Sequence, residues 1–291
     1  MKNQTFASIF AITAVLFWST AASAFKLSLR FVDILHLLLY ASCASLLVFF
    51  IALVVQKKAV LLRSCTLKDF ARSLGMGFLN PFLYYVVLFK AYSLLPAQQA
   101  MTLNYIWPLM LVLLSIPLLK QKISAKSIIA VAVSFAGVIV IATRGDITSL
   151  RFTSLTGVAL AIGSSVIWGL FWIANVRDRR DETVKLFMNF AFGTPMILLV
   201  TLFAAPRSIP AVKGLLGSAY VGLFEMGITY IFWLKALSLS RTTAQVGNLI
   251  YLSPFLSLLF IRIVVGEPIA VATVIGLALI VSGIVAQRRV G

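Results

Sequence analysis

The sequence predicts an all-α integral membrane protein with ten transmembrane helices in two five-helix inverted repeats and with both termini in the cytoplasm. The first observation behind this is composition: 61% of the 291 residues are hydrophobic, only 11% are charged, and the mean hydropathy is +1.04. Soluble domains are about 45–50% apolar and about 25% charged. The other two observations are an internal repeat and an uneven distribution of basic residues.

Ten long apolar runs separated by short polar links provide the helices, and this pattern differs from the alternating strands of a membrane barrel. In chain order the predicted spans cover residues 6–25, 34–55, 70–92, 98–118, 125–143, 155–176, 186–204, 213–239, 243–265 and 269–286. The first run, with Lys2 before it and Ala22-Ser23-Ala24 at its end, also resembles a signal peptide. We expect an uncleaved helix, because Leu16-Phe17-Trp18 is echoed by Val166-Ile167-Trp168 in the second half.

The internal repeat is clearest where polar residues match. The stretch KAYSL at 90–94 recurs as KALSL at 235–239, an offset of 145 residues. With one inserted residue, Tyr105 then matches Tyr251, and Pro108 matches Pro254. Apolar matches arise easily by chance in such a sequence, but matched Lys, Tyr and Pro in one register do not. We therefore divide the chain into two homologous five-helix repeats, residues 1–145 and 151–291.

Basic residues set the orientation. Of the 25 Lys and Arg residues, 17 fall on one side of the ten spans, which predicts that this side and both termini are cytoplasmic. Five spans per repeat invert the second repeat relative to the first, an arrangement typical of secondary transporters. The charges lie in short loops, so we expect contact with the lipid bilayer and none with nucleic acid.

Other classes of function find little support in the residues. No phosphate-binding glycine loop is present, so an ATP-driven pump is not expected. Eight scattered acids and one histidine, His36, do not suggest an enzyme. Cys43 and Cys65 have no metal-binding spacing, and we expect neither a metal nor a cofactor.

A family pattern is visible in the second half as Pro254, then Gly266-Glu267-Pro268, then Gly276 and Gly283. In the first half Pro108 and Gly137 match it, but Gln121 stands in place of the acid. The sequence thereby resembles the drug/metabolite transporter superfamily, in its ten-helix branch with paired EamA domains. The aromatic residues at 105–107 look most like those of bacterial aromatic amino-acid exporters. The resemblance implies a bacterial inner (plasma) membrane protein that exports small amphipathic metabolites, with aromatic amino acids favoured.

Polar residues inside the spans are the strongest candidates for a binding site, because charge in hydrocarbon is costly. Glu225 is the only acid in the middle of a span, and Asn80 is its counterpart in the repeat. Pro108 and Pro254 each remove a backbone hydrogen bond in the fourth helix of a half, which predicts kinks. The predicted substrate-binding residues are Trp18, Asn80, Tyr84, Tyr105, Trp107, Pro108, Trp168, Glu225, Tyr230, Tyr251 and Pro254.

Several alternatives remain open at the level of sequence. Glu225 could be a protonated packing residue or a structural hydrogen-bond partner, and the rings could be ordinary core. The substrate could be another metabolite, a drug or a lipid-linked molecule, and a membrane-embedded enzyme is the alternative from another class. Small residues in the fifth and tenth spans permit close helix packing, so we expect a monomer or a weak homodimer.

Overall fold

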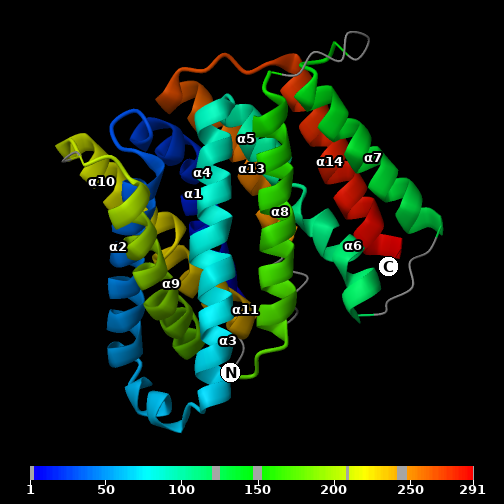
Figure 1. Cartoon of the computed structure of the whole chain (residues 1–291). Coiled ribbons are helices and arrows are strands. Elements are labelled where there is room, and N and C mark those ends of the chain that lie inside the picture. The colour runs from blue at the N-terminus through cyan, green and yellow to red at the C-terminus, as the bar shows by residue number, and fades with distance from the viewer. Residues whose placement is uncertain (1–2, 120–124, 147–152, 208–209, 241–247, 291) are drawn as a thin grey trace. The chain divides into compact units, whose positions relative to one another are not determined.

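The computed structural model describes residues 3–119, 125–146, 153–207, 210–240 and 248–290, and every regular element in them is a helix (Figure 1). Seven helical segments are long and apolar enough to cross a membrane, namely Gln4–Ser28, Ile34–Val55, Leu67–Leu94, Ala97–Leu118, Leu155–Asn175, Glu182–Ala204 and Val212–Leu239. Three shorter apolar helices, Ile128–Ala142, Leu249–Val265 and Val271–Ala286, coincide with the fifth, ninth and tenth predicted spans. The all-helical membrane class is therefore confirmed, while the count of ten spans and the inversion stay predictions.

The chain divides into two compact units, and each contains segments from both halves of the sequence. The first unit comprises Met1–Val86 and Asp178–Phe260, and the second comprises Val87–Arg177 and Ile261–Gly291. Elements of the first unit are α1 (Gln4–Ser28), α2 (Ile34–Val55), η1 (Ala59–Ser64), α3 (Leu67–Gly77), η2 (Phe78–Leu83), the start of α4 (Tyr84–Leu94), α9 (Glu182–Ala204), α10 (Val212–Tyr220), η3 (Val221–Glu225), α11 (Ile228–Leu239), η4 (Asn248–Leu252) and α13 (Ser253–Phe260).

Within the first unit, α1 packs on α11 and α13, whereas α9 packs on α2 and α3. Small side chains allow the first of these contacts, because Ala7, Ala11 and Ala236 are fully buried against one another. Side-chain oxygens fix where helices begin: Asp33 accepts from the first backbone N–H groups of α2, and Asp181 does the same for α9. Thr66 and Asp69 form a reciprocal capping box at the start of α3.

Two of the long segments are interrupted in their middle. Between α3 and α4, the π-helical turn η2 contains Asn80 in a non-helical conformation and the cis peptide bond to Pro81. Between α10 and α11, the π-helical turn η3 ends at Glu225 and is followed by Gly227, whose φ of −109° and ψ of −90° are also non-helical. These interruptions fall at equivalent positions of the sequence repeat, and the sequence analysis predicted neither.

The second unit contains the remainder of α4, then α5 (Ala97–Asn104), α6 (Trp107–Leu119), α7 (Ala125–Ala142), α8 (Leu155–Val176), η5 (Ile261–Val265) and α14 (Val271–Val290). Figure 1 shows α7 in green beside α14 in red. A Cβ atom on Gly137 would lie 2.5 Å from the carbonyl oxygen of Gly276, so the two backbones touch there. The small residues of these spans are thus used for packing inside one chain.

The two prolines of the fourth spans begin helices rather than bend continuous ones. Helix α5 ends at Asn104, and Pro108 is the second residue of α6. Pro254 is likewise the second residue of α13, directly after the 3-10 helix η4. Backbone N–H groups in the first turn have no partner within a helix, so proline is tolerated at these positions. The predicted irregularity is present, but each proline follows the break.

Candidate functional site

Three buried polar side chains of the first unit and the half-buried Glu225 meet at and beside the two interrupted segments. The hydroxyl group of Tyr85, in the first turn of α4, donates to Glu225 Oε1 at 3.3 Å. Tyr85 is fully buried, and Tyr230 on α11 is 3% exposed beside it. In a membrane, irregular backbone is tolerated where protein buries it or where it lines a polar cavity. These groups, with Asn80, form what we call the polar cluster: Asn80, Tyr85, Glu225 and Tyr230.

Two members of the polar cluster have unsatisfied hydrogen-bonding groups. Asn80 is completely buried, and neither its Oδ1 nor its Nδ2 has a hydrogen-bond partner, although its amide lies near the Tyr230 hydroxyl group. Glu225 Oε2 is buried and unpaired as well. Because most buried polar groups in native proteins are paired, such atoms commonly mark a position taken by water, an ion or a ligand.

Aromatic rings adjoin the polar cluster on its α1 side. The ring of Trp18 lies edge-on to Tyr230 at a centroid distance of 6.1 Å and at 5.4 Å from Trp233. Phe17 packs on Phe224 at 4.9 Å, immediately before Glu225 in the chain. Helix α1 therefore covers the break between η3 and α11 with an aromatic face.

The structure adds Tyr85 and Trp233 to the residues predicted from sequence in this unit. Tyr85 and Tyr230 are related by the same offset of 145 as Asn80 and Glu225, so the repeat register could have identified Tyr85. The predicted Tyr84 is also buried, with its ring 4.7 Å from that of Tyr85. Trp233 is one turn from Tyr230, and a helical stripe alone does not distinguish it from core.

Tyr251 and Pro254, also predicted, lie at the junction of η4 and α13, and both elements pack against α1. Ser257 Oγ donates to the carbonyl oxygen of Ser19 at 2.9 Å, which joins α13 to α1 close to Trp18. Of the eleven predicted site residues, the first unit therefore holds Trp18, Asn80, Tyr84, Glu225, Tyr230, Tyr251 and Pro254.

The other four predicted residues belong to the second unit: Tyr105, Trp107, Pro108 and Trp168. Tyr105 is 8% exposed in the turn between α5 and α6. Just before it, Asn104 Nδ2 donates to Ser164 Oγ of α8 at 2.8 Å. Trp168 stacks on Phe171 with centroids 5.5 Å apart. This unit thus holds a polar contact between the α5–α6 break and α8, and an aromatic stack on α8 itself.

The acid of the sequence pattern, Glu267, caps a helix. Its carboxylate accepts from the backbone N–H groups of Ala97 at 3.0 Å and Gln98 at 3.4 Å, at the start of α5. The Gln98 side chain donates to the Pro268 carbonyl oxygen at 2.9 Å and accepts from the Ala270 N–H at 2.9 Å. A carboxylate at a helix N-terminus is stabilising. Gln121, the first-half counterpart of Glu267, lies outside the described residues.

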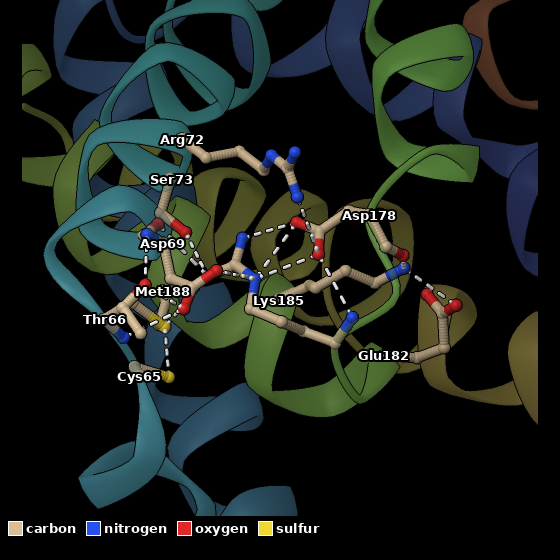
Figure 2. Close-up of polar contacts among 10 residues, drawn as sticks. Cys65, Thr66, Asp69, Arg72, Ser73, Asp178, Glu182, Lys185 and Met188 are labelled. Carbon is tan, nitrogen blue, oxygen red and sulfur yellow. Dashed lines mark hydrogen bonds and ion pairs between the residues drawn. The ribbon is translucent and has the colours of Figure 1, made fainter.

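A second polar centre lies at the start of α3 and of α9 (Figure 2). We call it the charged network, and it comprises Asp69, Arg72, Ser73, Asp178, Arg180, Glu182 and Lys185. Arg180 Nη2 donates to Asp178 Oδ2 at 2.5 Å, and Arg180 Nε donates to Asp178 Oδ1 at 3.0 Å. Arg180 Nη1 donates to Ser73 Oγ at 3.0 Å and to the Asp69 carbonyl oxygen at 3.2 Å. Arg180 thereby fixes the α8–α9 loop to α3.

The Asp178 side chain is only 2% exposed, so its charge depends on its partners. Burial by itself would raise the pKa of Asp178, but hydrogen bonds and charge from Arg180, with a smaller contribution from Arg72, lower it below its usual value. Conversely, burial opposes the charge of Arg180, and the Asp178 carboxylate outweighs this and raises the pKa of Arg180. The pair is therefore ionised at neutral pH.

Metal ligation has no obvious location in the part of the chain that is described. No group of three or more His, Cys, Asp or Glu side chains there could hold a metal ion. The acids of the charged network are instead surrounded by Arg and Lys.

Comparison with known proteins decides the family. Residues 5–143 and again residues 155–287 match the model of the EamA-like transporter family. The chain belongs to this family. The predicted resemblance to the EamA branch of the drug/metabolite transporter superfamily is thus confirmed, and the chain is a multi-pass membrane protein of a family of transporters.

Several EamA relatives are transporters by name. The uncharacterized transporter YyaM of Bacillus subtilis is 27% identical over 63% of this chain, and the aligned part spans 61% of YyaM. An uncharacterized transporter of Archaeoglobus fulgidus is 22% identical over 95% of this chain and 96% of its own length. The aromatic amino acid exporter YddG of Ancylobacter novellus is 26% identical over 72% of each chain. A crystal structure with 24% identity superimposes with a TM-score of 0.68 over 99% of both chains, which shows the shared fold.

Proposed function

We propose that this EamA protein is a secondary transporter of the bacterial inner membrane that exports small amphipathic metabolites, with amino acids and especially aromatic ones as substrates. The observation that carries the proposal is the polar cluster at two interrupted membrane segments. Discontinuous helices with polar groups near the bilayer midplane are where transporters of several folds bind their substrates. The aromatic face on α1 and the relative that exports aromatic amino acids favour substrates with rings.

The proposed mechanism is alternating access through a central cavity between the two sequence repeats. Apolar rings would bind the side chain of the substrate by stacking, and the few buried polar groups would orient its charged end. The Tyr85 hydroxyl group holds Glu225 Oε1 at 3.3 Å and leaves Oε2 directed elsewhere. The proposed binding residues are those predicted from the sequence, joined by Tyr85 and Trp233.

Uptake into proteoliposomes tests this function. Purified protein would be assayed with radiolabelled phenylalanine, tryptophan and threonine, each with and without a pH gradient. We expect saturable flux that favours the aromatic substrates and falls about tenfold or more in Trp18→Ala and Trp107→Ala. The matched control is Phe203→Ala, since Phe203 is 85% exposed and should leave flux unchanged. Absence of flux for all three amino acids would refute the substrate assignment.

A lipid-linked or drug substrate is the second candidate within the same family. In that case the vesicles would show no amino-acid flux. They would instead scramble a labelled lipid or accumulate a hydrophobic dye. The same vesicles serve both measurements.

A further inference from the structure

We propose that Glu225 and Asn80 form a subsite for a protonated amino group, so that the protein selects amines and amino acids over carboxylic acids that lack the amine. This inference rests on the transport function proposed above. It assigns one end of the substrate to two acceptor atoms of the first unit, Glu225 Oε2 and Asn80 Oδ1.

Four other acids of the chain have a basic partner of a kind that Glu225 lacks among the residues that the structure describes. Asp33, Asp178, Asp181 and Glu182 each lie within 4.0 Å of a basic nitrogen, at distances of 2.5, 2.5, 2.8 and 2.8 Å. Glu225 has no such partner in the described part of the chain, where its one hydrogen bond is from the neutral Tyr85 hydroxyl group. A buried carboxylate is stable as an anion only when a cation or several donors compensate it. A cationic ligand would supply the missing charge.

The unpaired atoms of Glu225 and Asn80 match an ammonium group. Glu225 Oε2 and Asn80 Oδ1 are acceptors, and Asn80 Nδ2 is a donor. An ammonium group has three donors and no acceptor, so it complements the two oxygens. A carboxylate without an amine would present only acceptors to the Glu225 carboxylate and would be repelled.

The aromatic rings beside the polar cluster favour a cation as well. Trp18, Tyr230 and Trp233 form a contiguous aromatic group, and Tyr230 belongs to the polar cluster itself. The faces of Trp and Tyr attract cations, and they do so more strongly where water is excluded. The rings and the carboxylate therefore favour a ligand of the same charge, although Trp18 belongs to α1 and Glu225 to the segment Val212–Leu239.

Three small molecules, each with a phenyl group but with different charged groups, test whether the protein recognises the amine. Phenylalanine carries both charged groups, phenethylamine carries only the amine, and 3-phenylpropanoate carries only the carboxylate. Binding to purified protein in detergent would be followed by tryptophan fluorescence, with Trp18 and Trp233 as nearby reporters. We expect phenylalanine and phenethylamine to bind about 10–100-fold more tightly than 3-phenylpropanoate, the range for a charge-assisted hydrogen bond at a buried site.

Substitution at Glu225 provides the second measurement. Glu225→Gln keeps the shape and removes the charge, so it should weaken phenethylamine about 10–100-fold and leave 3-phenylpropanoate equal or tighter. The matched control is Glu182→Gln, because Glu182 is half-exposed at the start of α9 and its loss should leave the selectivity unchanged. If Glu225→Gln fails to fold, equal binding of the three ligands by the wild-type protein would still refute the proposal.

The outcomes separate this proposal from the transport function. If phenylalanine is transported but 3-phenylpropanoate competes as well as phenethylamine, the amine subsite is refuted and the transporter stands. If Glu225→Gln loses only the flux driven by a pH gradient and keeps the amine preference, Glu225 carries protons and the subsite is again refuted. If phenethylamine alone binds through Glu225 and no amino acid is transported, the subsite stands and the substrate assignment fails.

Discussion

Neutralising Asp178 tests whether the charged network stabilises the first unit. In Asp178→Asn the shape of the side chain is kept, but one acceptor oxygen becomes an NH₂ donor that faces the Arg180 guanidinium group. The wild-type carboxylate accepts from the Arg180 backbone N–H at 3.1 Å and from its Nε and Nη2 atoms. It also lies 3.6 Å from Arg72 Nη1. The substitution therefore leaves a largely buried guanidinium group without its main counter-ion.

The expected cost follows from burial. Removing one partner of a fully buried ion pair costs about 3–5 kcal/mol, whereas exposed pairs contribute at most about 1 kcal/mol. Side chains of Asp178 and Arg180 are 2% and 13% exposed, so the pair is near the buried limit. Arg180 nevertheless keeps Ser73 and the Asp69 carboxylate, the latter at 3.8 Å. We therefore expect a loss of about 2–3 kcal/mol, which lowers the thermal midpoint by roughly 5–10 °C.

The assay heats purified protein in detergent to a series of temperatures. Size-exclusion chromatography then measures the fraction that remains folded, which gives the thermal midpoint. Glu182→Gln is the control, because the Glu182–Lys185 pair is half-exposed on the Glu182 side and its loss should cost less than about 1 kcal/mol. A midpoint for Asp178→Asn that lies within experimental error of that of Glu182→Gln would refute the reasoning that burial makes this network stabilising.

Three further predictions concern pH, packing and capping. The pKa of Asp178 is lower in the folded state than in the unfolded chain. Its contribution to the free energy of unfolding is therefore complete above the unfolded pKa of about 3.9 and is lost as the pH falls through the lower folded pKa. The difference in thermal midpoint between wild type and Asp178→Asn should therefore be constant from about pH 8 to pH 5 and shrink below about pH 4; a difference that grows on acidification contradicts this. Gly77→Ala should destabilise the protein by about 1–3 kcal/mol, because its Cβ atom would collide with the backbone of α9 at Asn189. The control is Gly75→Ala, whose Cβ atom meets nothing within 4 Å and which should be neutral or stabilising in the same unfolding assay. Glu267→Ala removes the cap of α5 and should cost about 1–2 kcal/mol by the same measurement, and an unchanged midpoint would show that water replaces the carboxylate.

Much of the architecture was predictable because it depends on local composition. Apolar runs long enough to span hydrocarbon must be helical, since a helix satisfies its own backbone hydrogen bonds in a medium without water. The runs at 34–55 and 155–176 therefore predict α2 (Ile34–Val55) and α8 (Leu155–Val176) with the bounds that the structure has. The resemblance carried by Pro254, Glu267 and Gly283 was likewise visible in the sequence, and the family that it indicated is confirmed by the family match.

By contrast, the breaks in the third and eighth spans were not predictable from hydropathy. A π-helical turn changes the backbone without changing composition, and Asn80-Pro81 and Gly227 are only weak local signals for it. The role of Glu267 was also hidden, because the helix that it caps begins 170 residues earlier at Ala97.

The sequence by itself determined the membrane class, the family and the singular position of Glu225, because the cost of charge in hydrocarbon depends on the residue and its span. Only the tertiary structure decided that the Tyr85 hydroxyl group donates to Glu225 and that Asp178 is buried beneath Arg180. Neighbouring residues on a helix point about 100° apart. Which of them meets a distant side chain is set by how helices pack, and that depends on contacts between segments far apart in the chain.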